Sequence, residues 1–287
     1  MTYDFIAVKI NPTIHMSQSR VNTTGNGATW TNGDQIKVNM VSKSTAAKKD
    51  SAVYKYTSSS WVLQGSDYMA WPANNSGEKY TFEAYYPYAE GSSSSFTNFD
   101  LPSDQSTEEK IKSADWMLAT TTTSKVESVN LPFKHMLAKL TVKIVKYGHF
   151  YNNPIPTVND PQFYVPFMAT IPKGKTMYVK ENASMLRGLM KEDKSAAKQH
   201  SFTILLIPGR YNEYTKFLQL NVNGQTRDVA TSNNDVLTKT GFKAGKAYTF
   251  NLIMGQTDIT IGDVTIEDWE TGNLQGEPGG DANEFTE

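Results

Sequence analysis

The segment VNLPFKHMLAKLTVKIV, residues 129–145, is the longest strand-like stretch of the chain. Between Met136 and Ile144 an apolar side chain stands at every second position, and Lys or Thr occupies most of the positions between. Successive side chains of a β-strand point to opposite faces, so this period of two predicts a strand with one buried face. We expect a domain boundary near the start of this segment.

Similar patterns on both sides of this segment predict an all-β protein. The same alternation occurs in residues 35–40, 80–86 and 248–254. The continuous apolar run 202–207 predicts a strand that is buried on both faces. Turn signals recur at intervals of about 8–12 residues, which is typical of β-sandwiches. They include Ser58-Ser59-Ser60 and Asn223-Gly224, and Gly262-Asp263 predicts a bulge.

We therefore predict two tandem β-sandwich domains with short helices in their loops. The domains cover residues 1–132 and 133–270, and an acidic, Gly-rich tail that we expect to be disordered covers residues 271–287. Residues 106–109 read Ser-Thr-Glu-Glu and match a capping box, which opens a helix. A second short helix is expected over residues 184–191.

The composition excludes several classes of function. The 287 residues include 28 Lys and Arg against 29 Asp and Glu, so no basic field exists that could hold a nucleic acid. The absence of Cys excludes disulfides, thiol catalysis and thiolate metal sites. No run of about 18 apolar residues is present that could span a membrane. Residues 1–4 lack the features of a signal segment, so an exported protein would have its signal outside this chain.

A strand with clean alternation is also predicted near the start of the chain, over residues 5–16. Its apolar face carries Ile6, Val8, Ile10, Ile14 and Met16. Pro12 has no backbone N–H group. We therefore expect this strand to lie at the edge of a sheet, or to pair on one side only at that point.

Five groups of residues, in the same order along the chain, resemble the Bacteroidetes fimbrillin (Mfa-like) family. They are Arg20 with TWTNGDQIKV at 29–38, YTFEAYYPY at 80–88, LPSDQS at 101–106 with SADWMLA at 113–119, FKHMLAKL at 133–140, and IEDW at 266–269. Trp116 stands where the family more usually has a smaller apolar residue. The resemblance extends over nearly the whole chain.

The resemblance implies a fold and a location. Members of the family have two transthyretin-like β-sandwich domains and are exported as lipoproteins anchored through an N-terminal Cys. Many assemble into surface fimbriae. Such a protein would lie at the cell surface, with other fimbrial subunits as partners and with the outer membrane reached through a lipid anchor. Because this chain has no Cys, the anchor would lie upstream, or the chain has been trimmed.

The resemblance also implies a site. In polymerising relatives a protease cuts after an arginine near the N-terminus, the first strand leaves, and a strand of another subunit fills the groove. Arg20 is the position that matches this arginine. The side chains that fill the groove, and leave with the strand, would be Ile6, Val8, Ile10 and Ile14. A permanent edge strand followed by an ordinary loop arginine explains the same residues.

Two other functions compete with that of a structural fimbrial subunit. A surface tip adhesin, or a module that binds a host glycan or protein, could stack sugars on aromatic side chains. Packing within the core explains these aromatic residues better; they are Trp30, Trp61, Trp71 and Trp116. A secreted hydrolase has only the generic support of abundant carboxylates.

The sequence contains no familiar motif for catalysis or for a cofactor. There is no Gly-x-Ser-x-Gly elbow, phosphate loop or dinucleotide fingerprint. The four His have no zinc-like spacing, and we expect His135 to be a packed, hydrogen-bonded core residue. We therefore predict no catalytic residue, no cofactor and no metal site. Asp50-Ser51-Ala52 matches a short O-glycosylation sequon used by exported proteins of this phylum.

Overall fold

The computed structural model describes residues 6–14, 30–41, 51–71, 77–90, 98–148, 156–170, 178–179, 183–192, 200–211, 215–232, 234–255 and 258–269. Within these ranges nearly all regular structure is β-strand, which confirms the all-β prediction. The predicted acidic tail, residues 271–287, lies outside the described residues.

A seven-stranded sheet organises the N-terminal part of the chain. From one edge to the other its strands are β2 (Ile10–Ile14), β10 (Val129–His135), β9 (Met117–Thr123), β7 (Tyr80–Tyr86), β3 (Gln35–Val41), β4 (Ser51–Thr57) and β5 (Ser60–Gln64). Neighbouring strands are antiparallel except for β2 and β10, which are parallel. Two shorter strands, β1 (Ile6–Ala7) and β6 (Ala70–Trp71), form a separate antiparallel pair.

The period-two patterns of this part bury one face of each strand. Ile36, Val38 and Met40 of β3 are buried, and the residues between them are partly exposed. Tyr80 and Phe82 of β7 are buried in the same way, as the alternation predicted. These residues belong to one hydrophobic cluster, which also holds Val129, Leu131 and Phe133 of β10.

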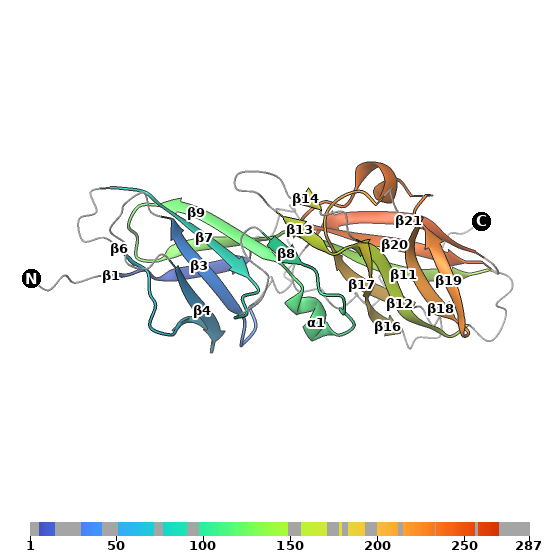
Figure 1. Ribbon diagram of the computed structural model, residues 1–287, viewed down its shortest axis with the longest axis horizontal. Helices are drawn as coiled ribbons and strands as arrows, with labels where there is room; N and C mark the ends of the chain where they lie inside the picture. Colours follow the sequence, from blue (N-terminus) through green and yellow to red (C-terminus); the bar gives the residue numbers. More distant parts are fainter. Residues whose placement is uncertain are drawn as a thin grey trace, which may run out of the picture.

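Two further sheets enclose a second hydrophobic cluster. The five-stranded sheet has the order β16 (Leu189–Glu192), β17 (His200–Leu206), β11 (Ala138–Tyr147), β20 (Lys246–Met254) and β21 (Ile259–Asp268). The four-stranded sheet has the order β15 (Ala183–Arg187), β12 (Val158–Pro166), β18 (Lys216–Val222) and β19 (Gln225–Ala230). Both sheets contribute to this cluster, for example Phe202 and Phe250 from the first and Phe163 and Leu218 from the second. Figure 1 shows β3, β4 and β7 towards one end of the long axis and β18 to β21 towards the other.

Short elements lie between these two groups of strands. They are the sheet of β8 (Asn98–Asp100), β13 (Met168–Thr170) and β14 (Tyr178–Val179), and the helix α1 (Glu108–Ser113). The π-helical turn η1 (Val236–Thr240) lies with the C-terminal strands, and its Val236 and Leu237 belong to the second cluster. Phe99 of β8 stacks on Trp116 with ring centroids 5.0 Å apart, and both side chains belong to the second cluster although they precede residue 133. The division of the chain into domains 1–132 and 133–270 therefore stays a prediction.

The segment of residues 129–145 breaks into two strands. β10 ends at His135 and β11 begins at Ala138, so the chain passes from the seven-stranded sheet to the five-stranded sheet across Met136 and Leu137. The Met136 N–H donates to the Trp116 carbonyl oxygen at 2.9 Å, which fixes the crossing point. The alternation of apolar residues predicted one continuous strand. This pattern is the same whether or not the strand changes its partner strands along its length.

The predicted helix over residues 184–191 is wrong, because this segment forms the strands β15 and β16. Gly188 separates the two strands and is buried. A Cβ atom at this position would lie 2.7 Å from Phe163 Cε2 and 3.2 Å from the Thr203 carbonyl oxygen. The chain thus makes a close contact with both sheets at a residue that has no side chain.

The predicted turns and the bulge are confirmed. Ser58 and Ser59 have φ of 50° and 67°, and Asn223 and Gly224 have φ of 50° and 80°, as in the tight turns that join hairpin strands. The register of β20 and β21 shifts between Phe250 and Leu252, opposite the predicted Gly262-Asp263 bulge.

The predicted helix after residue 106 is also present. Thr107, rather than Ser106, caps α1 by accepting a hydrogen bond from the Lys110 N–H at 3.2 Å.

Candidate functional site

The first described residues, 6–14, form a ribbon that we call the N-terminal ribbon. It consists of β1 and β2, which are separated by Val8 and Lys9. β1 pairs with β6, placing Ile6 opposite Trp71, and β2 pairs in parallel with β10, placing Ile10 opposite Val129. The predicted single strand over residues 5–16 is therefore interrupted in the middle. Phe5, His15 and Met16 lie outside the described residues.

β2 is an edge strand of the seven-stranded sheet, as Pro12 predicted. The Val129 N–H donates to the Lys9 carbonyl oxygen at 2.9 Å, so the parallel ladder uses the odd-numbered residues of the ribbon. The backbone groups of even-numbered residues point to the other side. Pro12 is an even-numbered residue, and its missing N–H group therefore leaves no gap in the ladder with β10.

Single contacts, rather than a second ladder, hold the open side of the N-terminal ribbon after β1. The Val8 N–H donates to the Met69 carbonyl oxygen at 2.9 Å, and the Tyr54 hydroxyl donates to the Val8 carbonyl oxygen at 3.4 Å. The Trp30 indole Nε1–H donates to the Pro12 carbonyl oxygen at 3.0 Å. Tyr54 comes from β4, near the opposite edge of the sheet, so the sheet curves until its two edges approach each other at the ribbon.

The inward side chains of the ribbon are Val8, Ile10, Pro12 and Ile14, and that of Pro12 is buried. Val8 is buried, with 4% of its surface exposed, whereas Ile10 and Ile14 are half-buried and pack against the hydrophobic cluster. Ile6 was expected on the same face but is 53% exposed. The reason is the break after Ala7, because β1 leaves the register of β2 and follows β6 instead.

Aromatic rings close the groove beside β2. Trp30 makes edge-to-face contacts with Trp61 at 5.0 Å, with Phe133 at 5.3 Å and with Tyr86 at 5.5 Å between ring centroids. Trp71 and Trp116 are buried in the first and second cluster respectively. The rings of these four Trp contact other core side chains, as the packing interpretation expected.

Burial of Tyr54 also changes its acidity. Desolvation raises the pKa of the Tyr54 phenol to about 12 from its ordinary value of 10. The phenol therefore stays a hydrogen-bond donor to the Val8 carbonyl oxygen at every physiological pH.

The local sequence pattern predicts the ribbon but not the residues that hold it. Tyr54, Met69 and the indole of Trp30 are far from the ribbon along the chain, and no local pattern connects them to it. A partial signal was present in Pro12, which indicated that one side of the strand has no ladder. Arg20, the predicted cleavage point, lies outside the described residues.

A comparison with family models matches residues 19–269 to the fimbrillin-like family. The chain belongs to the fimbrillin-like family. The match starts at the Ser19-Arg20 pair and ends at Trp269, the same limits that the sequence motifs gave. No curated protein sequence matched this fimbrillin-like chain.

Solved structures share the fold of this fimbrillin-like chain at low sequence identity. One is a candidate cell adhesion protein from Bacteroides uniformis, with 17% identity, a TM-score of 0.66, and coverage of 94% of this chain and 99% of the other. Another is a candidate cell adhesion protein from Bacteroides ovatus, with 20% identity, a TM-score of 0.66, and coverage of 92% and 98%. At these identities the likeness shows the fold alone.

The described residues also include a buried histidine outside the N-terminal ribbon. His135 is buried, with Nδ1 2.8 Å from Asp115 Oδ1 and its ring stacked on Trp269 at 4.0 Å, which confirms the expected packed and hydrogen-bonded His. Within the described ranges no three His, Asp or Glu side chains gather as metal ligands would. The described helices include none that is both long and apolar enough to cross a bilayer.

Proposed function

We propose that this fimbrillin-like protein is a structural subunit of a cell-surface fimbria and that subunits assemble by strand exchange. Family membership supports a fimbrial subunit or adhesin. The observation that carries the mechanism is the N-terminal ribbon, because an apolar strand occupies the edge of a sheet and covers part of a hydrophobic cluster. Its partners would be other fimbrial subunits, and a lipid anchor upstream of the chain would connect it to the outer membrane.

Removal of the ribbon would leave two kinds of unsatisfied surface. The backbone groups of β10 that now pair with β2 would lose their partners over Val129–Phe133. Leu131 and Phe133, which are fully buried, would become accessible together with the ring of Trp30. A strand from another subunit can satisfy both the backbone groups and the apolar surface, which is the physical basis of β-strand addition.

Cleavage after Arg20 would release the ribbon in this proposal. The ribbon and Arg20 lie on the same side of Trp30 in the sequence, so the cut leaves Trp30 with the body of the protein. The incoming strand would then meet the same indole donor, provided that it places a carbonyl oxygen where Pro12 now has one. Four ribbon residues, Ile6, Val8, Ile10 and Ile14, were predicted to fill the groove. The burial of Val8 and the partial burial of Ile10 and Ile14 support that role.

The proposal is tested by cleavage with a trypsin-like protease followed by peptide uptake. The protein is cut near Arg20, and residues 1–20 are followed by mass spectrometry after gel filtration. A fluorescent peptide with the sequence of residues 5–16 is then added, and its binding is measured by fluorescence polarisation. We expect loss of the ribbon from the cleaved protein and saturable uptake of the peptide.

Two matched controls sharpen this experiment. The variant Arg20→Gln should resist the cut at this position and should not take up the peptide, and a peptide with Val8→Asp should not bind to the cleaved protein. A cleaved protein that keeps residues 1–20 on gel filtration and takes up no peptide at any concentration would refute strand exchange for this subunit. The alternative of a surface tip adhesin, or of a module that binds a glycan or protein, would then remain.

A further inference from the structure

We propose that the outer face of β3, β4 and β5 carries a binding site for an uncharged saccharide of two or three sugar units. The site is a hollow of about 700 Å³ that we call the outer hollow. Ligand pockets in proteins generally have volumes of about 300–1,000 Å³. The outer hollow lies on the face of the sheet opposite to the hydrophobic cluster, so it is independent of the core and of the groove under the N-terminal ribbon.

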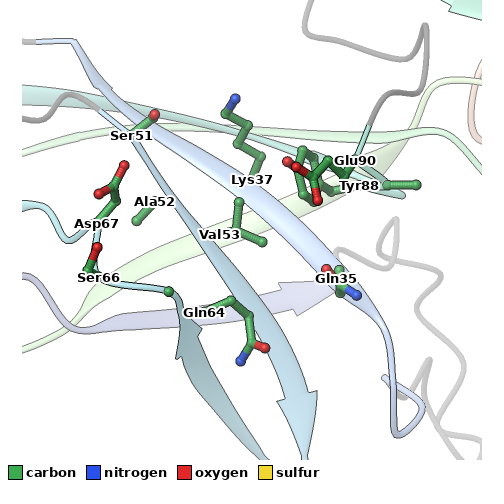
Figure 2. A pocket seen from close by; sticks show the side chains of 12 residues that line it. Gln35, Lys37, Ser51, Ala52, Val53, Gln64, Ser66, Asp67, Tyr88 and Glu90 are labelled. Atoms are coloured by element: carbon green, nitrogen blue, oxygen red, sulfur yellow. The ribbon is translucent and has the colours of Figure 1, made fainter.

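The floor of the outer hollow follows from the alternation of three adjacent strands. Ile36 and Tyr54 point into the core, so their neighbours in sequence point outward. Lys37 of β3, Val53 of β4 and Gln64 of β5 stand opposite one another in the register and form a row across the sheet. Figure 2 shows this row at the centre of the hollow.

The walls of the outer hollow come from the segments that follow β5 and β7. Residues 65–67 leave the end of β5 and place Asp67 on one side of the floor. Residues 88–90 follow β7 and place Tyr88 and Glu90 on the opposite side. The Tyr88 N–H donates to the Gln35 carbonyl oxygen at 3.0 Å, which ties this wall to the start of β3.

The side chains of the hollow match the chemistry of a sugar. Val53 offers an apolar floor to the C–H face of a pyranose ring, and polar side chains surround it. The Gln35 amide can donate and accept hydrogen bonds, as the hydroxyl groups of a sugar require. The Gln64 Nε2 already donates to the Val62 and Leu63 carbonyl oxygens, so Gln64 offers its Oε1 as an acceptor. Tyr88 adds an aromatic ring with a polar hydroxyl group. This combination suits a sugar, which has an apolar C–H face and hydroxyl groups around its edge.

The charges of the hollow disfavour an anionic ligand. One cation, Lys37, stands against two carboxylates, Asp67 and Glu90, which gives the lining a formal charge of −1. Lys37 Nζ lies 5.7 Å from the centroid of the Tyr88 ring, so the ammonium group is held over an aromatic face. Sulfated or sialylated glycans would meet two carboxylates, which disfavours them relative to neutral glycans.

This inference does not depend on strand exchange. The outer hollow uses β3, β4 and β5, whereas the N-terminal ribbon pairs with β10 at the other edge of the sheet. A subunit could therefore polymerise without binding sugar, or bind sugar without polymerising. A negative result in the peptide-uptake experiment would refute strand exchange but not the saccharide site. A negative result in the glycan experiment below would refute the saccharide site but not strand exchange.

The experiment uses the whole chain in two steps. The protein is applied to a printed array that carries neutral, sialylated and sulfated glycans. ¹⁵N-labelled protein is then titrated with lactose, mannobiose and diacetylchitobiose, and with the best neutral glycan from the array. We expect at least one neutral glycan to bind. Chemical-shift changes should be confined to the amides of residues 35–37, 51–53, 64–67 and 88–90.

Three variants decide where the glycan binds. Gln64→Ala and Tyr88→Ala each remove a lining side chain and should weaken binding at least tenfold. Thr120→Ala, on the exposed face of β9 and outside the hollow, is the matched control and should leave the affinity unchanged. Circular dichroism melts of all three variants establish that each one folds. The proposal is overturned if no neutral glycan binds, if only acidic glycans bind, or if the hollow variants bind as tightly as the control.

Discussion

Truncation of Val8 to Ala tests which side chains of the N-terminal ribbon fill the groove. Val8 has only 4% of its surface exposed. Ile6 was predicted on the same face but is 53% exposed. The two side chains are both aliphatic and two positions apart. Their different environments therefore give a matched pair of substitutions within one ribbon.

The expected magnitudes follow from burial. Val8→Ala removes two methyl groups, each worth about 0.8 kcal/mol of transfer free energy when buried, and leaves a small cavity, so we expect a loss of about 2 kcal/mol. Ile6→Ala removes atoms that are largely in water already. Substitutions at such surface positions change the free energy of unfolding by about 0.5 kcal/mol or less.

Urea unfolding of both variants, followed by tryptophan fluorescence, measures this difference. Trp30 and Trp61 lie in the cluster that Val8 contacts, so the transition that reports on this cluster should move to lower urea for Val8→Ala at an unchanged m-value. Ile6→Ala should leave the midpoint almost in place. An equal loss for both variants, or a larger loss for Ile6→Ala, would refute the break between β1 and β2.

The substitution Val8→Ala, made in the peptide of residues 5–16, also tests strand exchange. If the peptide of residues 5–16 occupies the groove in the register of the ribbon, Val8→Ala in the peptide should weaken its uptake by the same free energy. A loss of about 2 kcal/mol corresponds to a roughly 30-fold weaker affinity. A peptide that binds equally well with Val8 or Ala would indicate a different register.

Three further substitutions test other parts of the structure. Trp30→Phe keeps an aromatic ring but removes the donor to the Pro12 carbonyl oxygen, so urea unfolding should show a loss of about 1 kcal/mol or slightly more. Gly188→Ala places a Cβ atom 2.7 Å from Phe163 Cε2, and thermal unfolding should show a loss of about 1–3 kcal/mol. Because the pKa of Tyr54 is about 12 in the folded chain and 10 unfolded, the free energy of unfolding should fall as pH rises from 10 to 12, and Tyr54→Phe should remove about 2–3 kcal/mol of that fall. A Tyr54→Phe variant whose stability follows the same pH dependence as the parent protein would contradict the burial of this phenol.

Local patterns predicted the strands and hairpins because both depend on neighbouring residues. The alternation of 35–40 and 80–86 predicted β3 and β7, and Asn223-Gly224 predicted the turn between β18 and β19. The segment 184–191 was misread as helical because its apolar residues fit a short helix as well as two strands. The pairing of β15 with β12 and of β16 with β17, which comes from distant parts of the chain, decides between them.

At the N-terminal ribbon, too, local patterns predicted some features, and contacts with distant segments decided the others. Alternation predicted the inward positions of Val8, Ile10 and Ile14 correctly, because the chain keeps one register against the core from Val8 to the end of β2. Ile6 differs because its partner is Trp71, and a pairing over that sequence distance leaves no periodic signal in either segment. The contacts of Tyr54 and Trp30 with the ribbon also leave no signal in the sequence. They form only because the curved sheet brings its two edges together at the ribbon.

The two sides of β2 differ in a way that bears on exchange. On one side a continuous parallel ladder joins β2 to β10, and on the other side Pro12 offers no donor while its carbonyl oxygen meets the indole of Trp30. Departure of the ribbon therefore breaks the ladder with β10, the short pairing of β1 with β6 and a few single hydrogen bonds. A strand inserted between two ladders would expose two edges when it left, at roughly twice the loss of backbone hydrogen bonds. Pro12 on the open side keeps β2 at the edge of the sheet. This placement lowers the free-energy difference between the filled groove and the open groove. The proposed strand exchange requires such a small difference.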